Sequence, residues 1–313
     1  MAYNEFDLIS HYFGHIGKSA LAEVLLGVGD DAAVVNCSPN SVVLTVDTLV
    51  SGVHFFEDDP ADSIAHKALM VNLSDLSAMG ATPFAFLLSI TLPAVDDAWL
   101  TLFSSTLNRV ATDHDVQLIG GDITSGPLSV SITALGSVKD AHVLKRSAAR
   151  VDDDIYVTGE IGLAAFYVYA RTQGIALGEL ALQAYRYPEP CVSLGAKLSA
   201  LAHAAIDVSD GLLADLSHVL TDSHVGARLV RADIPIAKEW CVLPSNEAFM
   251  HAVTGGDDYV LCFTAPKSAR GLLDMLSSTA EVPLTRIGEI CEGEGLYIDE
   301  QRWEGKVGYQ HFV

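Results

Sequence analysis

Aspartates at junctions between expected elements are the residues of this sequence best suited to chemistry. Several stand beside a glycine or near the end of an expected strand: Asp30, Asp47, Asp122, Asp207, Asp210 and Asp257. Carboxylate oxygens are hard ligands, and Mg²⁺ in proteins is typically held by one or two carboxylates together with substrate phosphates. A single such aspartate is often an N-cap or a turn residue. Their recurrence at comparable junctions predicts a metal site that could bind phosphates.

Asp75 lies instead within an expected helix at residues 62–79. The apolar positions Ile64, Ala68 and Val71 lead to Asp75 at helical spacing, which places Asp75 on the buried face. A lone buried carboxylate is costly, so Asp75 should be paired or bound to metal. Lys67 lies eight positions earlier in the chain and cannot be its i±4 partner.

The composition is strongly acidic. The chain has 313 residues, with 18 Lys+Arg against 40 Asp+Glu and a formal net charge of −22. Such a surface repels nucleic acid and anionic membranes, which argues against both as partners. It also repels ATP unless metal ions reverse the local field. An acidic crevice holding several Mg²⁺ ions is therefore the arrangement by which this chain could bind a triphosphate.

Two glycine-containing segments resemble phosphate-binding loops but fit them poorly. Residues 14–19 end in Gly-Lys-Ser, yet Tyr12 stands where a P-loop has its first glycine, and the segment before it reads as a helix. Residues 27–32 fit G-x-G-x-x-A, but Asp30 and Asp31 would repel a bound pyrophosphate. The sequence therefore disfavours both a P-loop and a Rossmann site.

Cysteine spacing and hydropathy predict a protein of the reducing cytoplasm. The five cysteines lie far apart and form no C-x-x-C pair, so isolated thiols are expected rather than zinc ligands or disulfides. Residues 1–10 are polar and acidic, unlike a signal peptide. The longest largely apolar stretch, residues 83–95, is interrupted by proline and is too short to span a membrane.

Expected strands alternate with expected helices along the chain. In the first half, strands are expected at residues 42–47, 84–92, 116–120 and 128–138, and helices at 62–79 and 96–112. In the second half, strands are expected at 155–158, 204–208, 259–263 and 284–290, and helices at 161–171, 191–202 and 211–220. A charged stretch separates the halves, which predicts two mixed α/β domains at residues 1–150 and 151–313.

Six motifs, in order, resemble those of the thiamine-monophosphate kinase family, which belongs to an ATP-binding superfamily that includes aminoimidazole ribonucleotide synthetase. They occupy residues 27–32, 47–55, 67–75, 120–122, 207–212 and 255–259, and the chain ending is also similar. The resemblance implies ATP-dependent phosphorylation of thiamine monophosphate to thiamine diphosphate. It implies an α+β fold like that of aminoimidazole ribonucleotide synthetase, and a homodimer whose N-terminal sheets close a barrel, with ATP bound nearby.

The resemblance also implies three sets of site residues. The metal set comprises Asp30, Thr45, Asp47, Asp75, Asp122, Asp207 and Asp210. The ATP contacts are Gly121, Asp122, Arg146 and Ser209, and the substrate contacts are His54, Asp257 and Tyr309. Three positions depart from the family pattern: Val46 replaces a common hydroxyl residue, Asp257 replaces the usual Glu, and Tyr309 stands where some members have Trp.

The implied acceptor is a phosphate monoester, whose second pKa is about 6, so it is largely a dianion at neutral pH. A strong general base is therefore not required, and the main obstacle is repulsion between two polyanions. Metals and Arg146 would bridge the phosphates and align a direct in-line attack, without a phosphorylated enzyme intermediate. Tyr309 could stack on the cationic thiazolium ring, and Asp257 could offset its charge.

Two other functions fit the same residues. One is another ATP-dependent enzyme of the superfamily, a synthetase or kinase with a different acceptor. The other is a non-catalytic acidic module that binds divalent cations without turning over ATP. A panel of acceptors with labelled ATP separates these functions from the phosphorylation of thiamine monophosphate.

Overall fold

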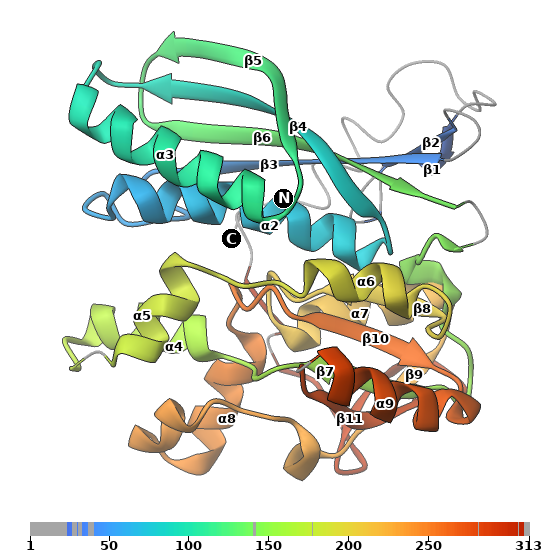
Figure 1. Ribbon diagram of the computed structural model, residues 1–313. Coiled ribbons are helices and arrows are strands. Elements are labelled where there is room, and N and C mark those ends of the chain that lie inside the picture. Colours follow the sequence, from blue (N-terminus) through green and yellow to red (C-terminus); the bar gives the residue numbers. More distant parts are fainter. Residues whose placement is uncertain are drawn as a thin grey trace, which may run out of the picture.

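Two β-sheets organise the computed structural model, which describes residues 24–26, 30, 33–36, 41–139, 142–176, 178–280, 282–305 and 307–309. The first sheet has six strands in the order β1-β2-β3-β6-β4-β5 (Figure 1). The second has seven strands in the order β13-β12-β9-β11-β7-β10-β8. The α+β class that the family resemblance implied is confirmed.

The first sheet is built from strands that alternate buried and accessible positions. Its strands are β1 (Val24–Leu26), β2 (Ala33–Asn36), β3 (Ser41–Val50), β4 (Thr82–Leu92), β5 (Gln117–Ser125) and β6 (Ser129–Val138). β3 and β6 pair antiparallel over their full length, whereas β4 and β5 run parallel and are joined by α3 (Asp97–Asp113). One face packs on α2 (Ala61–Ala78), and alternate side chains point to the opposite, open face.

The helix α2 lies between the two sheets and is buried nearly all round (Figure 1). It packs on β3 and β6 on one side and on α6 and β8 on the other. Within it, only Asp62 and Asp75 fall outside the buried class. The expectation that Asp75 lies on the buried face of an amphipathic helix is therefore wrong, because α2 has almost no solvent face and Asp75 is partly accessible.

The second sheet has short strands whose central members are buried on both faces. Its strands are β7 (Asp154–Thr158), β8 (Ala204–Asp207), β9 (Gly226–Leu229), β10 (Leu261–Ala265), β11 (Leu284–Cys291), β12 (Gly295–Ile298) and β13 (Gln301–Arg302). Every residue of β7 and β10 is buried, because helices or other elements cover both sides of these strands.

Helices surround this second sheet. They are α4 (Leu163–Gln173), α5 (Glu179–Arg186), α6 (Val192–Leu198), α7 (Leu212–Ser223), α8 (Ser245–Thr254) and α9 (Arg270–Ala280). Short 3₁₀ turns are η3 (Arg146–Ala148), η4 (Arg231–Asp233), η5 (Lys238–Val242) and η6 (Lys267–Ala269). None of the helices in the described part of the chain is both long and apolar enough to cross a bilayer.

Two aspartates expected at strand ends lie inside strands instead. Asp47 is within β3, because β3 stays paired with β6 as far as Val50. Asp122 is within β5, because the two glycines before it do not end that strand. Gly121 has φ +151°, and a Cβ there would lie 1.8 Å from the Leu88 carbonyl oxygen, so only glycine fits this close pairing with β4.

Candidate active site

A cavity of about 740 Å³ opens where β3 and α2 meet α4, α8 and the loop between β8 and α7. Its lining contains eight residues that the sequence singled out: Asp47, His54, Asp75, Asp207, Ser209, Asp210, Asp257 and Tyr309. These residues come from both halves of the chain. The cavity is therefore the place where most of the expected site converges.

Asp47, Asp75, Asp207 and Asp210 form an acidic wall of the cavity. Neighbouring polar groups form hydrogen bonds with three of them. Thr45 donates its hydroxyl proton to Asp75 across 2.5 Å, which places this predicted ligand beside the cavity. Ser74 donates to Asp207 across 2.7 Å, and the Asp47 backbone N–H donates to the Asn72 side-chain oxygen across 3.1 Å. Both Ser74 and Asn72 belong to α2, so this helix contacts predicted metal ligands on β3 and on β8.

The acidic wall suits a hard cation that takes some of its oxygen ligands from the protein and the rest from a bound phosphate or from water. In the described part of the chain, no three His, Cys, Asp or Glu side chains converge closely enough to enclose a metal by themselves. The donors around the cavity are carboxylate and hydroxyl oxygens from Thr45, Asp47, Asp75, Asp207 and Asp210. Mg²⁺ usually keeps several waters or phosphate oxygens and takes only one or two carboxylates, so this open donor set fits it.

Asp215 organises the loop that carries Ser209 and Asp210. Its buried carboxylate oxygen accepts hydrogen bonds from three successive backbone N–H groups, those of Ser209, Asp210 and Gly211, across 3.0, 3.1 and 3.1 Å. A Cβ at Gly256 would lie 2.0 Å from the Ser209 carbonyl oxygen, so the two loops approach as closely as backbones can. These contacts hold Ser209 and Asp210 in the positions from which they line the cavity.

The predicted substrate contacts also line the cavity, and the N–H groups of Asp257 and Tyr309 donate to the carbonyl oxygens of Ser209 and Asp210, each across 2.9 Å. His54 Nδ1 accepts from the Val50 N–H across 3.0 Å, so in the neutral ring the proton resides on Nε2. Asp257 has φ +68° and forms an ion pair with Lys67 across 3.0 Å. Its other oxygen accepts from the Tyr259 hydroxyl across 2.9 Å. Burial, and then the charge of Asp257, raise the pKa of Tyr259 well above its usual value, so Tyr259 remains a donor.

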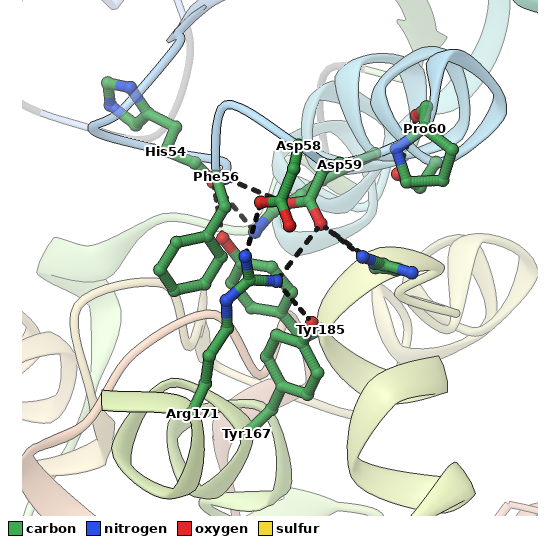
Figure 2. Close-up of polar contacts among 11 residues, drawn as sticks. His54, Phe56, Asp58, Asp59, Pro60, Tyr167, Arg171 and Tyr185 are labelled. Atoms are coloured by element: carbon green, nitrogen blue, oxygen red, sulfur yellow. Dashed lines mark hydrogen bonds and ion pairs between the residues drawn. The ribbon is translucent and has the colours of Figure 1, made fainter. Parts of the chain in front are cut away.

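Aromatic rings form much of the remaining lining. Phe56 and Tyr185 line the cavity, and Tyr167, which lies behind them, stacks on Tyr185 with the ring centroids 4.7 Å apart and packs against Phe56 (Figure 2). Figure 2 also shows Arg171, whose guanidinium lies 3.9 Å from the Phe56 ring centroid. Further lining rings are Tyr169, Trp240 and His251. The cavity thus combines an acidic wall with an aromatic one.

Salt bridges attach the loop at residues 52–59 to the helices α4 and α5. Arg186 pairs with the buried Asp59 across 2.8 Å, and Arg171 pairs with the exposed Asp58. Asp59 also accepts from the Phe56 N–H across 2.9 Å. These contacts hold the His54 segment against the second half of the chain.

Four expected site residues lie away from this cavity. Asp30 pairs with Arg146 across 3.4 Å, outside the cavity lining. Gly121 and Asp122 lie on the outermost strand β5. Asp122 is in register with Ser89, and through β6 with Thr48, which places it on the open face about 14 Å from β3 across three strand spacings. One chain alone therefore does not assemble the whole expected set.

Several lining residues were not expected from the sequence. Tyr169, Tyr185, Trp240 and His251 gave no local signal, because ordinary core aromatics have the same spacing. Lys67, which lies behind the lining rather than in it, did give a signal: it is a lysine inside a largely apolar helix, and it is 2% exposed. The predictions that fall on residues 14–19, 27–29 and 31–32 lie outside the described residues.

Comparison with known proteins defines the class. The family model described as AIR synthase related protein, N-terminal domain, matches residues 29–138. The model of the corresponding C-terminal domain matches residues 150–300. The chain therefore consists of the N-terminal and C-terminal domains of an AIR synthase related protein.

Full-length relatives narrow this class to one family. A thiamine-monophosphate kinase of Escherichia coli is 41% identical over 331 residues, covering 100% of this chain and 99% of the relative. The crystal structure of thiamine-monophosphate kinase from Stenotrophomonas maltophilia is 41% identical with a TM-score of 0.82, covering 97% of this chain and 99% of that one. AaThiL complexed with AMPPCP and TMP is 27% identical with a TM-score of 0.86, covering 99% and 97%. The chain belongs to the thiamine-monophosphate kinase family.

Proposed function

We propose that this chain phosphorylates thiamine monophosphate to thiamine diphosphate with ATP as the phosphate donor. The observation that carries the proposal is the single cavity lined by the aspartates Asp47, Asp75, Asp207 and Asp210 and by aromatic rings. An acidic wall suits metal-bound phosphates, and an aromatic wall suits a flat cationic heterocycle. Family membership over the full length supports the same reaction.

The predicted metal set consists of Asp30, Thr45, Asp47, Asp75, Asp122, Asp207 and Asp210. Bound Mg²⁺ would neutralise the phosphates and screen the repulsion between donor and acceptor. In the described cavity, Thr45 and Ser74 hold Asp75 and Asp207 in place for this task. Ser209 is held by Asp215 beside Asp210 and would contact ATP together with Gly121 and Arg146.

Direct in-line transfer fits the groups around the cavity. The attacking oxygen would belong to a phosphate monoester that is already ionised near neutral pH, so positioning and charge neutralisation supply most of the catalysis. His54, Asp257 and Tyr309 would hold the organic part of the acceptor. Tyr309 is 46% exposed and lines the cavity, which leaves its ring available for stacking.

A second copy of the chain would complete the site. The edge strand β5 exposes the apolar side chains Leu118, Ile119 and Ile123, the last to 70%. Val46 on the open face of β3 is 61% exposed. An exposed apolar edge strand offers unpaired backbone groups and apolar side chains to which another chain can bind. A homodimer joined through the first sheet would cover these residues and bring Gly121 and Asp122 of β5 into a shared barrel.

The test is a transfer assay with labelled ATP and a panel of acceptors that includes thiamine monophosphate. Formation of labelled thiamine diphosphate supports the proposal, and Asp75→Asn and Asp210→Asn should each lower turnover at least about a hundredfold with an intact fold. Asp113→Asn, an exposed carboxylate on α3, is the control. Transfer to another acceptor only, or calorimetric binding of MgATP without any turnover, would overturn the assignment.

A further inference from the structure

Lys67 is a buried cation that touches both halves of the chain. Its ammonium group lies 3.0 Å from an Asp257 carboxylate oxygen and donates to the His54 carbonyl oxygen across 3.3 Å. It also sits 4.1 Å from the centroid of the Tyr185 ring. Lys67 thus connects two of the three predicted substrate contacts, which lie about 200 positions apart in the sequence.

The ammonium group does not reach the cavity itself. Lys67 is absent from the lining of the large cavity and instead lines a smaller hollow behind it, with Leu49, Phe55 and Ile64. Its side chain is 3% exposed, whereas that of its partner Asp257 is 30% exposed. An acceptor in the cavity could therefore contact Asp257 but not Lys67, so Lys67 would act through its partner.

The conformation of Asp257 is specific, and its carboxylate is oriented by two side chains. Its φ of +68° is in the left-handed region, which side chains other than glycine enter at a cost. The next residue, Asp258, is turned the other way, and its carboxylate accepts from the Gly162 N–H at the start of α4 across 2.9 Å. The direction of the Asp257 carboxylate is then set by Lys67 on one oxygen and by Tyr259 on the other.

We propose that Lys67 is a positioning residue that fixes Asp257 and the His54 segment at a set separation, and so sets affinity for the organic part of the acceptor. This inference rests on the proposed function. A buried lysine without a partner would be costly, so the ion pair is kept in place by the same burial that separates it from solvent. The Asp257 backbone N–H donates separately to the Ser209 carbonyl oxygen across 2.9 Å, so loss of the Lys67 ion pair would redirect the Asp257 carboxylate without removing this backbone link to the nucleotide side of the cavity, around Ser209 and Asp210.

The experiment is a kinetic double-mutant cycle on the full-length protein. Lys67→Met keeps the length of the side chain and removes its charge. We expect the KM for thiamine monophosphate to rise about tenfold or more and the KM for ATP to change less than about twofold. Lys197→Met, which removes an exposed lysine from α6, is the matched control and should leave both KM values unchanged.

The second arm tests whether Lys67 acts through Asp257. Asp257→Asn alone should raise the KM for the acceptor, and adding Lys67→Met to it should raise that KM by less than about twofold more. The double variant leaves no unpaired buried charge. Its KM for the acceptor can therefore be measured even if Lys67→Met alone is strongly destabilised.

Each outcome decides one point. An equal rise in both KM values, or effects of the two substitutions that multiply, would overturn the positioning role. An acceptor KM that is unchanged in Lys67→Met would overturn it as well. A wild-type protein that forms no thiamine diphosphate would overturn the proposed function instead.

Discussion

The loop held by Asp215 offers the sharpest test of how the site is organised. The perturbation is Asp215→Asn, which keeps the shape of the side chain and removes its charge. In the native protein one carboxylate oxygen accepts from the N–H groups of Ser209, Asp210 and Gly211 across 3.0–3.1 Å, and Asp215 is 3% exposed. Loss of the charge weakens all three bonds together.

The magnitude follows from the number of bonds. A hydrogen bond to a charged group contributes about 1.5–3 kcal/mol and a neutral one about 1, so three weakened bonds amount to about 3 kcal/mol. The neutral amide is cheaper to bury than a carboxylate, which offsets part of that loss. We therefore expect the free energy of unfolding to fall by about 2 kcal/mol. Since Ser209 and Asp210 would shift, turnover should fall about tenfold to a hundredfold.

Urea unfolding and the labelled-ATP assay measure these two effects on the same preparation. With an m value of about 3 kcal/mol/M, a loss of 2 kcal/mol lowers the midpoint by about 0.7 M. The control is Asp113→Asn, in which an exposed carboxylate of α3 loses its charge and a weak surface pair with Arg109. Its midpoint and its turnover should match those of the wild type.

Two results would refute this reasoning. A midpoint for Asp215→Asn equal to that of the control would mean that the three hydrogen bonds contribute no net stability. Normal turnover despite a lowered midpoint would mean that Asp215 supports the fold without positioning Ser209 and Asp210 for catalysis.

Three further predictions concern other parts of the chain. Asp59→Asn removes the charge from a buried carboxylate, leaves its partly buried partner Arg186 uncompensated, and should cost about 3 kcal/mol in urea unfolding. Asp58→Asn changes a side chain that is 73% exposed and should cost less than about 1 kcal/mol, so equal losses would contradict this. Burial lowers the pKa of His218 from 6.5 to about 4, so its protonation favours the unfolded state, and stability should fall by about 2–3 kcal/mol as the pH drops from about 6.5 to 4. His218→Gln should flatten that slope, and an unchanged slope would assign the loss to other groups. Ile123→Lys on β5 should give a monomer in sedimentation experiments while Val95→Lys, at an equally exposed loop position, stays dimeric; a dimeric Ile123→Lys would exclude this edge as the interface.

Local sequence signals located part of the site correctly. Asp207 ends β8, and Asp210 precedes α7, as the change from a buried strand to a helical pattern predicted. The same reasoning failed for Asp47 and Asp122, which lie inside strands. Strand length here is decided by pairing with β6 and β4, and those partners are distant in sequence, so the local pattern could not show where the strands end.

Long-range contacts account for what the sequence did not show. The hydrogen bond between Ser74 and Asp207 joins residues 133 positions apart, and the bond between Tyr185 and the His54 carbonyl joins residues 131 apart. No local spacing encodes such pairs. The aromatic wall was missed for this reason, while the acidic wall was found because each of its members also stands in a recognisable local motif.

The all-round burial of α2 has a consequence for how this chain can be cut or recombined. Its last turns belong to the second half as much as to the first: Ser77 donates to the Cys191 carbonyl oxygen, and a Cβ at Gly195 would lie 2.0 Å from the Ser77 carbonyl oxygen. A fragment ending at residue 150 would leave this side of α2 in water. Chimaeras between relatives should therefore remain soluble only when α2 and α6 are inherited from the same parent.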